Sequence, residues 1–231
     1  MLIAITSHAC EVDDAHLCVE YNHRVKFVSP VKPLRNSDAI EAFVKAANNC
    51  EFDAILFTSA FAAIKIAPFL NSEIASKVRI IANGPQTAKK LDEIKLDAEM
   101  LPFFYSKDLI PYLGRWIRGK KIGIPRADIA YMKLSHDIEC AGGIPCEYKC
   151  YDLAATNEEL DIKGCGAVLF TSPAAFMMAK LPDTDDVIEM AIGEVTEKAM
   201  MYMGHIPDVV GDGSIEGTLK ALNVYLITGC H

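Results

Sequence analysis

The chain has 231 residues, of which 51% are hydrophobic and 23% charged, and its formal net charge at pH 7 is −8. This length suits one large or two small domains, and the composition is that of a globular protein rather than a disordered one. The acidic charge argues against nucleic-acid binding, and no apolar run approaches the roughly 20 residues that a membrane span requires. Because no basic stretch precedes the first apolar residues, we expect no secretory signal and a cytoplasmic location.

Six short apolar runs along the chain predict β-strands. Each run is nearly continuous rather than alternating, which is typical of parallel strands covered on both faces of a sheet. The predicted strands are Leu2–Ser7, Ala54–Thr58, Val78–Ala82, Lys121–Pro125, Ala167–Thr171 and Val187–Ile192.

Helical patterns alternate with these strands, and this alternation predicts an α/β architecture. One helix is expected at Asp38–Asn48, with Ser37 as its N-cap. The others are expected at Ala60–Leu70, Pro85–Ile94, Ser106–Arg118, Ala130–Ala141, Pro173–Ala179, Glu194–Met203 and Ser214–Leu226.

Two stretches of the chain are repeated in the same order. Asp53–Ala63 matches Gly166–Phe176, and Ala82–Leu91 matches Ala191–Met200, at offsets of 113 and 109 residues. A weaker echo relates the run that begins at Leu2 to the run that begins at Lys121. The period is too long for a solenoid, so the sequence predicts a duplicated domain with two similar lobes.

The repeated segments place polar turns where predicted strands end and helices begin. Thr58 and Ser59 in one copy, and Thr171 and Ser172 in the other, can cap the following helix. A second pair of turns combines a glycine with a helix-opening threonine: Gly84 with Thr87, and Gly193 with Thr196. Such turns bind anions at helix N-termini and the carboxyl ends of parallel strands, although simple capping is the alternative interpretation.

The eight cysteines contain no C-x-x-C pair, and the six histidines show no metal-binding spacing. We therefore interpret the cysteines as reduced, buried thiols and predict no metal site.

The order and spacing of these segments resemble the uroporphyrinogen-III synthase family. The resemblance covers most of the chain and departs at the first turn, where Thr6-Ser7-His8 replaces the Thr-Arg-Pro-like turn common in relatives. It rests on Leu56–Ser59, Asn83–Ala88, Gly119–Arg126, Gly142–Tyr151, Val168–Pro173, Ala191–Thr196 and Gly204.

The repeat alone suggests two sequential halves that divide near Gly119, whereas the resemblance implies a crossed arrangement. In the crossed arrangement, residues 1–30 and 152–231 form lobe one and residues 35–145 form lobe two. Two connecting strands, at residues 26–34 and 144–153, would act as a hinge, and both alternate like extended segments. The family also implies a monomer.

The resemblance implies a hydro-lyase that cyclises hydroxymethylbilane, with inversion of ring D through a spiro intermediate and loss of water. No cofactor is expected, and porphobilinogen deaminase is the expected source of the substrate. The protein would act mainly by folding the bilane and orienting its terminal ring. One alternative is a non-catalytic tetrapyrrole- or anion-binding regulatory protein on the same scaffold, and a second is an unrelated two-lobed solute-binding protein.

The resemblance assigns the catalytic role to Tyr151, as proton donor to the leaving hydroxyl or as an orienting group. Tyr148 and His8 are weaker candidates for the site. Arg126 can bind a carboxylate through two hydrogen bonds or be a solvated surface residue. The expected substrate-binding residues are Thr58, Ser59, Gly84, Thr87, Arg126, Thr171, Ser172, Gly193 and Thr196.

Overall fold

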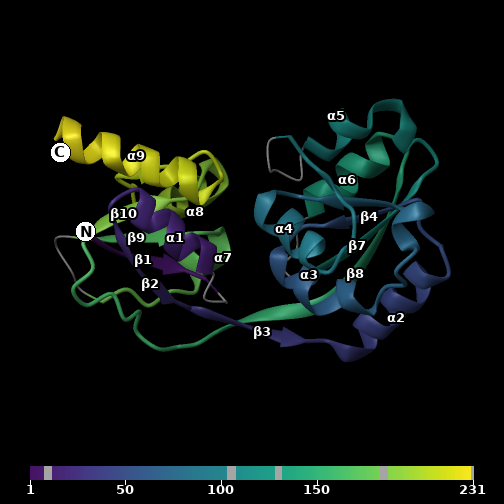
Figure 1. Cartoon of the computed structure of the whole chain (residues 1–231), viewed down its shortest axis with the longest axis horizontal. Coiled ribbons are helices and arrows are strands. Elements are labelled where there is room, and N and C mark those ends of the chain that lie inside the picture. Colours follow the sequence, from purple (N-terminus) through teal and green to yellow (C-terminus); the bar gives the residue numbers. More distant parts are fainter. Residues whose placement is uncertain (8–11, 103–107, 128–131, 183–186, 230–231) are drawn as a thin grey trace. The chain divides into compact units, whose positions relative to one another are not determined.

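The computed structural model describes residues 1–7, 12–102, 108–127, 132–182 and 187–229. The chain divides into two compact units. Unit 1 comprises Met1–Pro33 and Leu153–His231, and unit 2 comprises Leu34–Asp152. Each unit is an α/β sandwich around its own sheet (Figure 1). His8 and the first residues of the helices expected at Ser106 and Ala130 lie outside the described residues.

The sheet of unit 1 has the strand order β11-β10-β9-β1-β2, and its paired strands are parallel. Because β1 pairs with both β2 and β9, the first strand of the chain lies inside the sheet. The strands are β1 Leu2–Thr6, β2 Arg24–Val28, β9 Ala167–Phe170, β10 Ile188–Ala191 and β11 Val209–Val210.

Side chains from both faces of this sheet are buried. Ile3 and Ile5 of β1 pack in a cluster with residues of α1 and α9, whereas Ala4 between them packs with residues of α7 and α8. Helices therefore cover both faces, which explains the continuous apolar runs of the strands. The helices are α1 Val12–Glu20, α7 Pro173–Met177, α8 Glu194–Tyr202 and α9 Ile215–Thr228.

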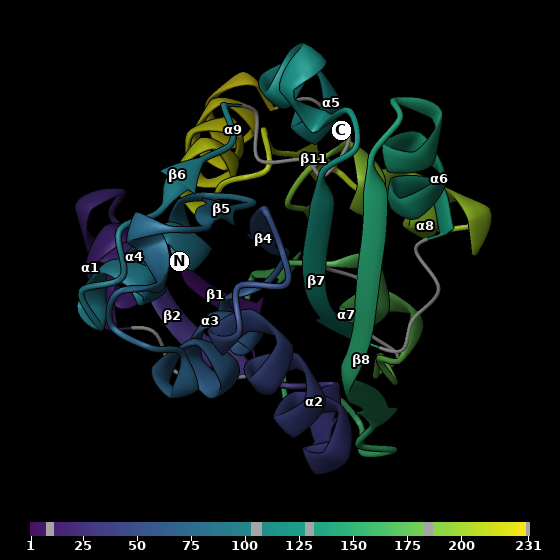
Figure 2. The same ribbon diagram turned by 90° about the vertical axis from the view of Figure 1, so that its right-hand side faces the viewer.

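The sheet of unit 2 has the order β3-β8-β7-β4-β5-β6. The neighbouring pairs β8–β7, β7–β4, β4–β5 and β5–β6 are parallel, and β7 and β8 run side by side in Figure 2. The long strand β8 continues past Asp152 into unit 1. The strands are β3 Val31–Arg35, β4 Ala54–Phe57, β5 Arg79–Ala82, β6 Glu99–Met100, β7 Lys121–Ala127 and β8 Ile144–Ala155.

Helices also flank the sheet of unit 2. Residues of α5 and α6 pack with Leu56 and Ile124 in one core cluster, while α3 contacts β4 and β7 and α4 contacts β5. The helices are α2 Ser37–Asn48, α3 Ala60–Ile66, α4 Pro85–Glu93, α5 Leu109–Leu113 and α6 Met132–Cys140. Together the two units confirm the predicted fold class of two parallel sheets flanked by helices.

Several predicted boundaries were wrong for local reasons. Ser37 is not the N-cap of α2, because the side chain of Asn36 accepts the hydrogen bond from the Ala39 N–H and the helix begins at Ser37. The helix expected at Ala60–Leu70 ends at Ile66 and continues as a short 3₁₀ turn. The helix expected at Ser106–Arg118 likewise becomes a 3₁₀ turn at Gly114, which has a φ of 53°.

Two absences hold for the described part of the chain. None of its helices is long and apolar enough to cross a membrane. None of its histidine, cysteine, aspartate and glutamate side chains gather in groups of three or more that could hold a metal ion.

Candidate active site

The first polar turn of unit 2 lies directly after the buried strand β4. Thr58 follows the last residue of β4, and Ser59 is the N-cap of α3, with its Oγ accepting a hydrogen bond from the Ala62 N–H at 3.1 Å. This bond satisfies one of the amide groups that the first turn of a helix leaves without a partner. The predicted capping role of Ser59 is therefore confirmed.

The same serine also contacts Tyr151 of β8. The Tyr151 Oη and the Ser59 Oγ lie 2.7 Å apart, and the tyrosine ring packs on Phe61 with ring centroids 4.5 Å apart. Tyr151 is only 6% exposed. Burial raises the pKa of its phenol, and the hydrogen bond with Ser59 only partly opposes this rise. The phenol is therefore protonated at neutral pH, as a proton donor must be.

A shallow cavity of about 370 Å³ in unit 2 is lined in part by Tyr151. Its other lining residues come from the end of β3, the start of α2 and the neighbouring part of β8, and they carry charges of both signs. They are Leu34, Arg35, Asn36, Ser37, Asp38, Lys149 and Asp152. Neither Arg35 nor Lys149 was singled out from the sequence, although both lie in or beside the predicted connecting strands.

Arg126 lies near the end of β7 and has a carboxylate partner within its own unit. Its Nε is 2.9 Å from Oε1 of Glu147, and its Nη2 donates to Oε2 at 3.0 Å. Ser135 also donates to Glu147, at 2.5 Å. Burial raises the pKa of Glu147, but the hydrogen bonds from Arg126 and Ser135 and the nearby positive charges outweigh it and lower the pKa overall. A substrate carboxylate would have to share Arg126 with Glu147.

The two glycine turns have the same geometry in both units. Gly84 is the N-cap of α4 and Gly193 is the N-cap of α8, and both have extended backbone that any residue can adopt. Thr87 and Thr196 lie in the first turns of these helices and are 5% and 2% exposed. Both threonines are thus buried residues.

The hydroxyl turn of unit 1 is held by a residue that was not selected from the sequence. Ser172 is the N-cap of α7 and accepts a hydrogen bond from the Ala175 N–H at 3.1 Å, as predicted. The hydroxyls of Thr171 and of Thr6, the last residue of β1, form hydrogen bonds across the two strands. Only the strand order, in which β1 lies beside β9, reveals this role of Thr6.

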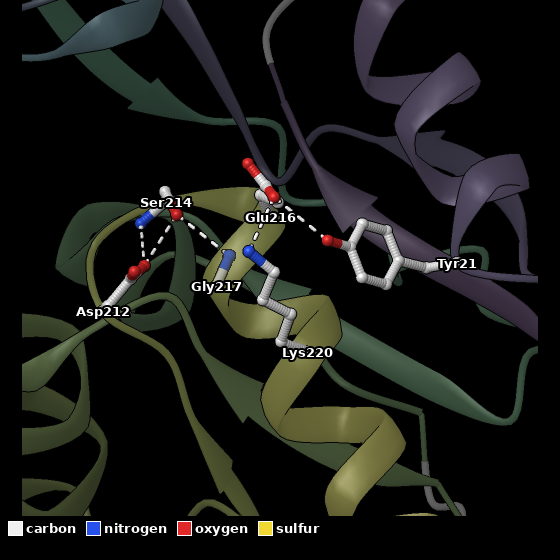
Figure 3. Close-up of polar contacts among 6 residues, drawn as sticks. All are labelled: Tyr21, Asp212, Ser214, Glu216, Gly217 and Lys220. Carbon is white, nitrogen blue, oxygen red and sulfur yellow. Dashed lines mark hydrogen bonds and ion pairs between the residues drawn. The ribbon is translucent and has the colours of Figure 1, made fainter.

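The side chains of Asp212 and Ser214, which directly precede α9, form hydrogen bonds at the N-terminus of this helix (Figure 3). The Oδ1 of Asp212 accepts from both the amide and the hydroxyl of Ser214, and the Ser214 Oγ accepts from the Gly217 N–H. In the first turn of α9, Glu216 accepts a hydrogen bond from the Tyr21 hydroxyl and forms an ion pair with Lys220. A carboxylate of the chain thus already occupies the place at which this helix would bind an anion.

The structure therefore brings the predicted residues together in separate groups: Tyr151 with Ser59 in unit 2, and Thr171 beside Ser172 in unit 1. The family model described as uroporphyrinogen-III synthase HemD matches residues 25–214, which include all of these residues. The chain belongs to this family.

Solved structures of the uroporphyrinogen-III synthase family share the fold. A mutant uroporphyrinogen III synthase from the extremely thermophilic bacterium Thermus thermophilus is 17% identical, with a TM-score of 0.59 and coverage of 98% of this chain and 99% of that chain. The uroporphyrinogen-III synthetase from Helicobacter pylori is 16% identical, with a TM-score of 0.59 and coverage of 97% and 98%. No curated protein matches the chain in sequence. At these identities the likeness establishes the fold.

Proposed function

We propose that the chain is a uroporphyrinogen-III synthase, a hydro-lyase that cyclises hydroxymethylbilane with inversion of ring D and loss of water. Its membership of the family supports this proposal. The observation that carries it is the buried Tyr151 phenol, whose oxygen lies 2.7 Å from the Ser59 hydroxyl at the carboxyl end of β4.

In this proposal, Tyr151 gives its proton to the departing hydroxyl of the bilane. The Ser59 Oγ accepts from the Ala62 N–H and can donate its own proton to the Tyr151 oxygen. When Ser59 donates in this hydrogen bond, the Tyr151 proton remains available for the leaving group. This direction also places a hydrogen-bond donor on the oxygen that gains negative charge as the proton moves.

The remaining predicted residues are proposed to bind the substrate. The amide groups at the starts of α4 and α8, beside Gly84 and Gly193, suit the substrate's carboxylates. Because these donors belong to the backbone, an acidic chain can bind a polyanion. The proposed side-chain contacts are Thr58, Ser59, Thr87, Arg126, Thr171, Ser172 and Thr196. The proposed enzyme works as a cytoplasmic monomer without a cofactor, and it receives the bilane from porphobilinogen deaminase.

A coupled assay tests this proposal. Hydroxymethylbilane is generated with porphobilinogen deaminase, and the type III and type I uroporphyrinogen isomers are then separated and measured. We expect type III from the wild-type chain and a loss of about 10²-fold in its rate of formation in Tyr151→Phe. Tyr148→Phe is the matched control, because this tyrosine lies on the same strand and packs on Phe43 and Phe52.

The possible results separate the proposal from its alternative. Formation of type I alone at high protein concentration contradicts the enzyme. If the chain nevertheless binds the bilane tightly, it is a non-catalytic tetrapyrrole-binding protein. A Tyr151→Phe variant that retains the full rate contradicts the role of the phenol alone.

A further inference from the structure

The hydroxyls of Thr6 and Thr171 link β1 to β9 at the carboxyl end of the unit 1 sheet. The Thr6 side chain is buried, with 1% of its surface exposed. Its Oγ1 accepts from the Thr171 N–H at 2.9 Å and donates to the Leu169 carbonyl at 3.0 Å. In return, the Thr171 Oγ1 donates to the Thr6 carbonyl at 2.5 Å.

These partners fix where each hydroxyl proton points. A carbonyl oxygen can only accept, so the protons of both hydroxyls are directed into the protein. The two Oγ1 atoms are 3.3 Å apart and either could donate to the other, but the shorter bonds of both hydroxyls go to carbonyl oxygens. Thr171 is half-buried rather than buried. With its proton directed to the Thr6 carbonyl, the Thr171 oxygen can offer a lone pair to a further donor.

We propose that the Thr171 oxygen accepts a hydrogen bond from a pyrrole N–H of the bilane, and that Thr6 is the positioning residue that holds it for this purpose. This inference rests on the proposed function. A linear tetrapyrrole carries two kinds of polar group, carboxylates that accept and pyrrole N–H groups that donate. To bind a carboxylate, Thr171 would have to break its bond to the Thr6 carbonyl, whereas it can accept from an N–H without any change.

The hydroxyl turn of unit 1 would then bind a different part of the substrate from the helix starts. Amide groups at helix starts suit the carboxylates, while an oriented hydroxyl oxygen suits the ring nitrogens. A site that uses both recognises the nitrogen edge of a pyrrole ring as well as its charged arms. Such recognition would distinguish the ring to be inverted from a ring presented the other way round.

Substitutions at Thr171 test the acceptor. Binding is measured with a non-cyclising bilane and with four analogues, each N-methylated on one ring. Thr171→Val, which is isosteric but lacks the oxygen, is expected to bind the parent bilane about tenfold more weakly. For the analogue methylated on the contacted ring, the variant and the wild type should bind with the same affinity. The effects of the substitution and of N-methylation are then coupled for one ring alone. Thr171→Ser keeps the oxygen and should retain wild-type affinity.

A loss of affinity that is the same for the parent and all four analogues would overturn the acceptor role, as would unchanged binding in Thr171→Val. If the wild-type chain neither binds nor converts any bilane, the proposed function has failed instead. The two failures are therefore distinguishable.

Substitutions at Thr6 test the positioning role in the coupled assay. Thr6→Val removes the acceptor of the Thr171 N–H, so we expect the KM to rise several-fold and the share of type III to fall, with a smaller change in kcat. Thr6→Ser keeps the bonds and should restore both values. If Thr6→Val lowers only the melting temperature and leaves the KM and the isomer ratio unchanged, Thr6 is merely structural.

Discussion

Replacing Ser59 with alanine removes one oxygen that serves two partners. Its bond from the Ala62 N–H caps α3, and loss of such a cap costs about 1 kcal/mol of unfolding free energy. Its contact with the Tyr151 hydroxyl is lost as well, and leaving the hydroxyl of this buried residue without a partner costs about 1–3 kcal/mol. We therefore expect Ser59→Ala to destabilise the chain by about 2–4 kcal/mol in urea unfolding.

A double-mutant cycle separates the two contributions. Tyr151→Phe removes the phenol oxygen but leaves the cap of α3, and Ser59→Thr keeps a hydroxyl for both partners. Because the two hydroxyls are in contact at 2.7 Å, the double variant should be about 1 kcal/mol more stable than the sum of the single effects predicts. Additive effects would refute the hydrogen bond between Ser59 and Tyr151.

The same variant changes the pH dependence of the proposed reaction. Burial raises the pKa of Tyr151, and the hydrogen bond with Ser59 opposes that rise. In Ser59→Ala the opposing effect is lost, so the pKa rises further. Since the protonated phenol is the active form, the alkaline loss of activity should move to higher pH. The weaker acid should also lower kcat by about tenfold. An alkaline limb at the same pH in both proteins would contradict the role of Tyr151.

Two further predictions concern stability. Glu147→Gln breaks the ion pair with Arg126 and should cost about 1–2 kcal/mol at neutral pH, less than a fully buried pair. Because the folded pKa of Glu147 is lowered, its contribution is present above the ordinary pKa and is lost as the pH falls through the folded value. The variant should therefore lose less stability than the wild type on acidification below about pH 4, measured by urea unfolding. Gly211→Ala places a Cβ 2.0 Å from the Thr218 Oγ1 and should cost about 1–3 kcal/mol, whereas Gly166→Ala meets its nearest atom at 3.4 Å and should cost less.

The fold could be predicted because its signals are local. Continuous apolar runs identify buried parallel strands, and the serines after β4 and β9 mark helix starts that the structure confirms at Ser59 and Ser172. The N-cap of α2 was missed because Asn36 and Ser37 are both good capping residues. The three-dimensional structure shows that the Asn36 side chain is the one that accepts from the Ala39 N–H.

The contacts of the candidate site could not be predicted in the same way, because they join segments far apart in the sequence. Ser59 meets Tyr151 across 92 residues, and Thr6 meets Thr171 across 165. Both contacts depend on which strands are neighbours in each sheet. The apolar pattern predicts that each strand exists but does not predict its position in the sheet. A repeat therefore identifies matching turns without identifying the residues that contact them.

The two copies of the serine turn share their cap and differ in what else the serine touches. Ser172 caps α7 as Ser59 caps α3, with bonds of equal length, but among the described residues only Ser59 of the two contacts a tyrosine hydroxyl. Ser172→Ala should therefore cost only the cap, about 1 kcal/mol, against about 2–4 kcal/mol for Ser59→Ala. Urea unfolding of both variants in the full chain measures the difference. Equal losses would mean that the Tyr151 hydroxyl does not stabilise the serine turn of unit 2. The structural difference between the two copies that supports Tyr151 as a proton donor would then be contradicted.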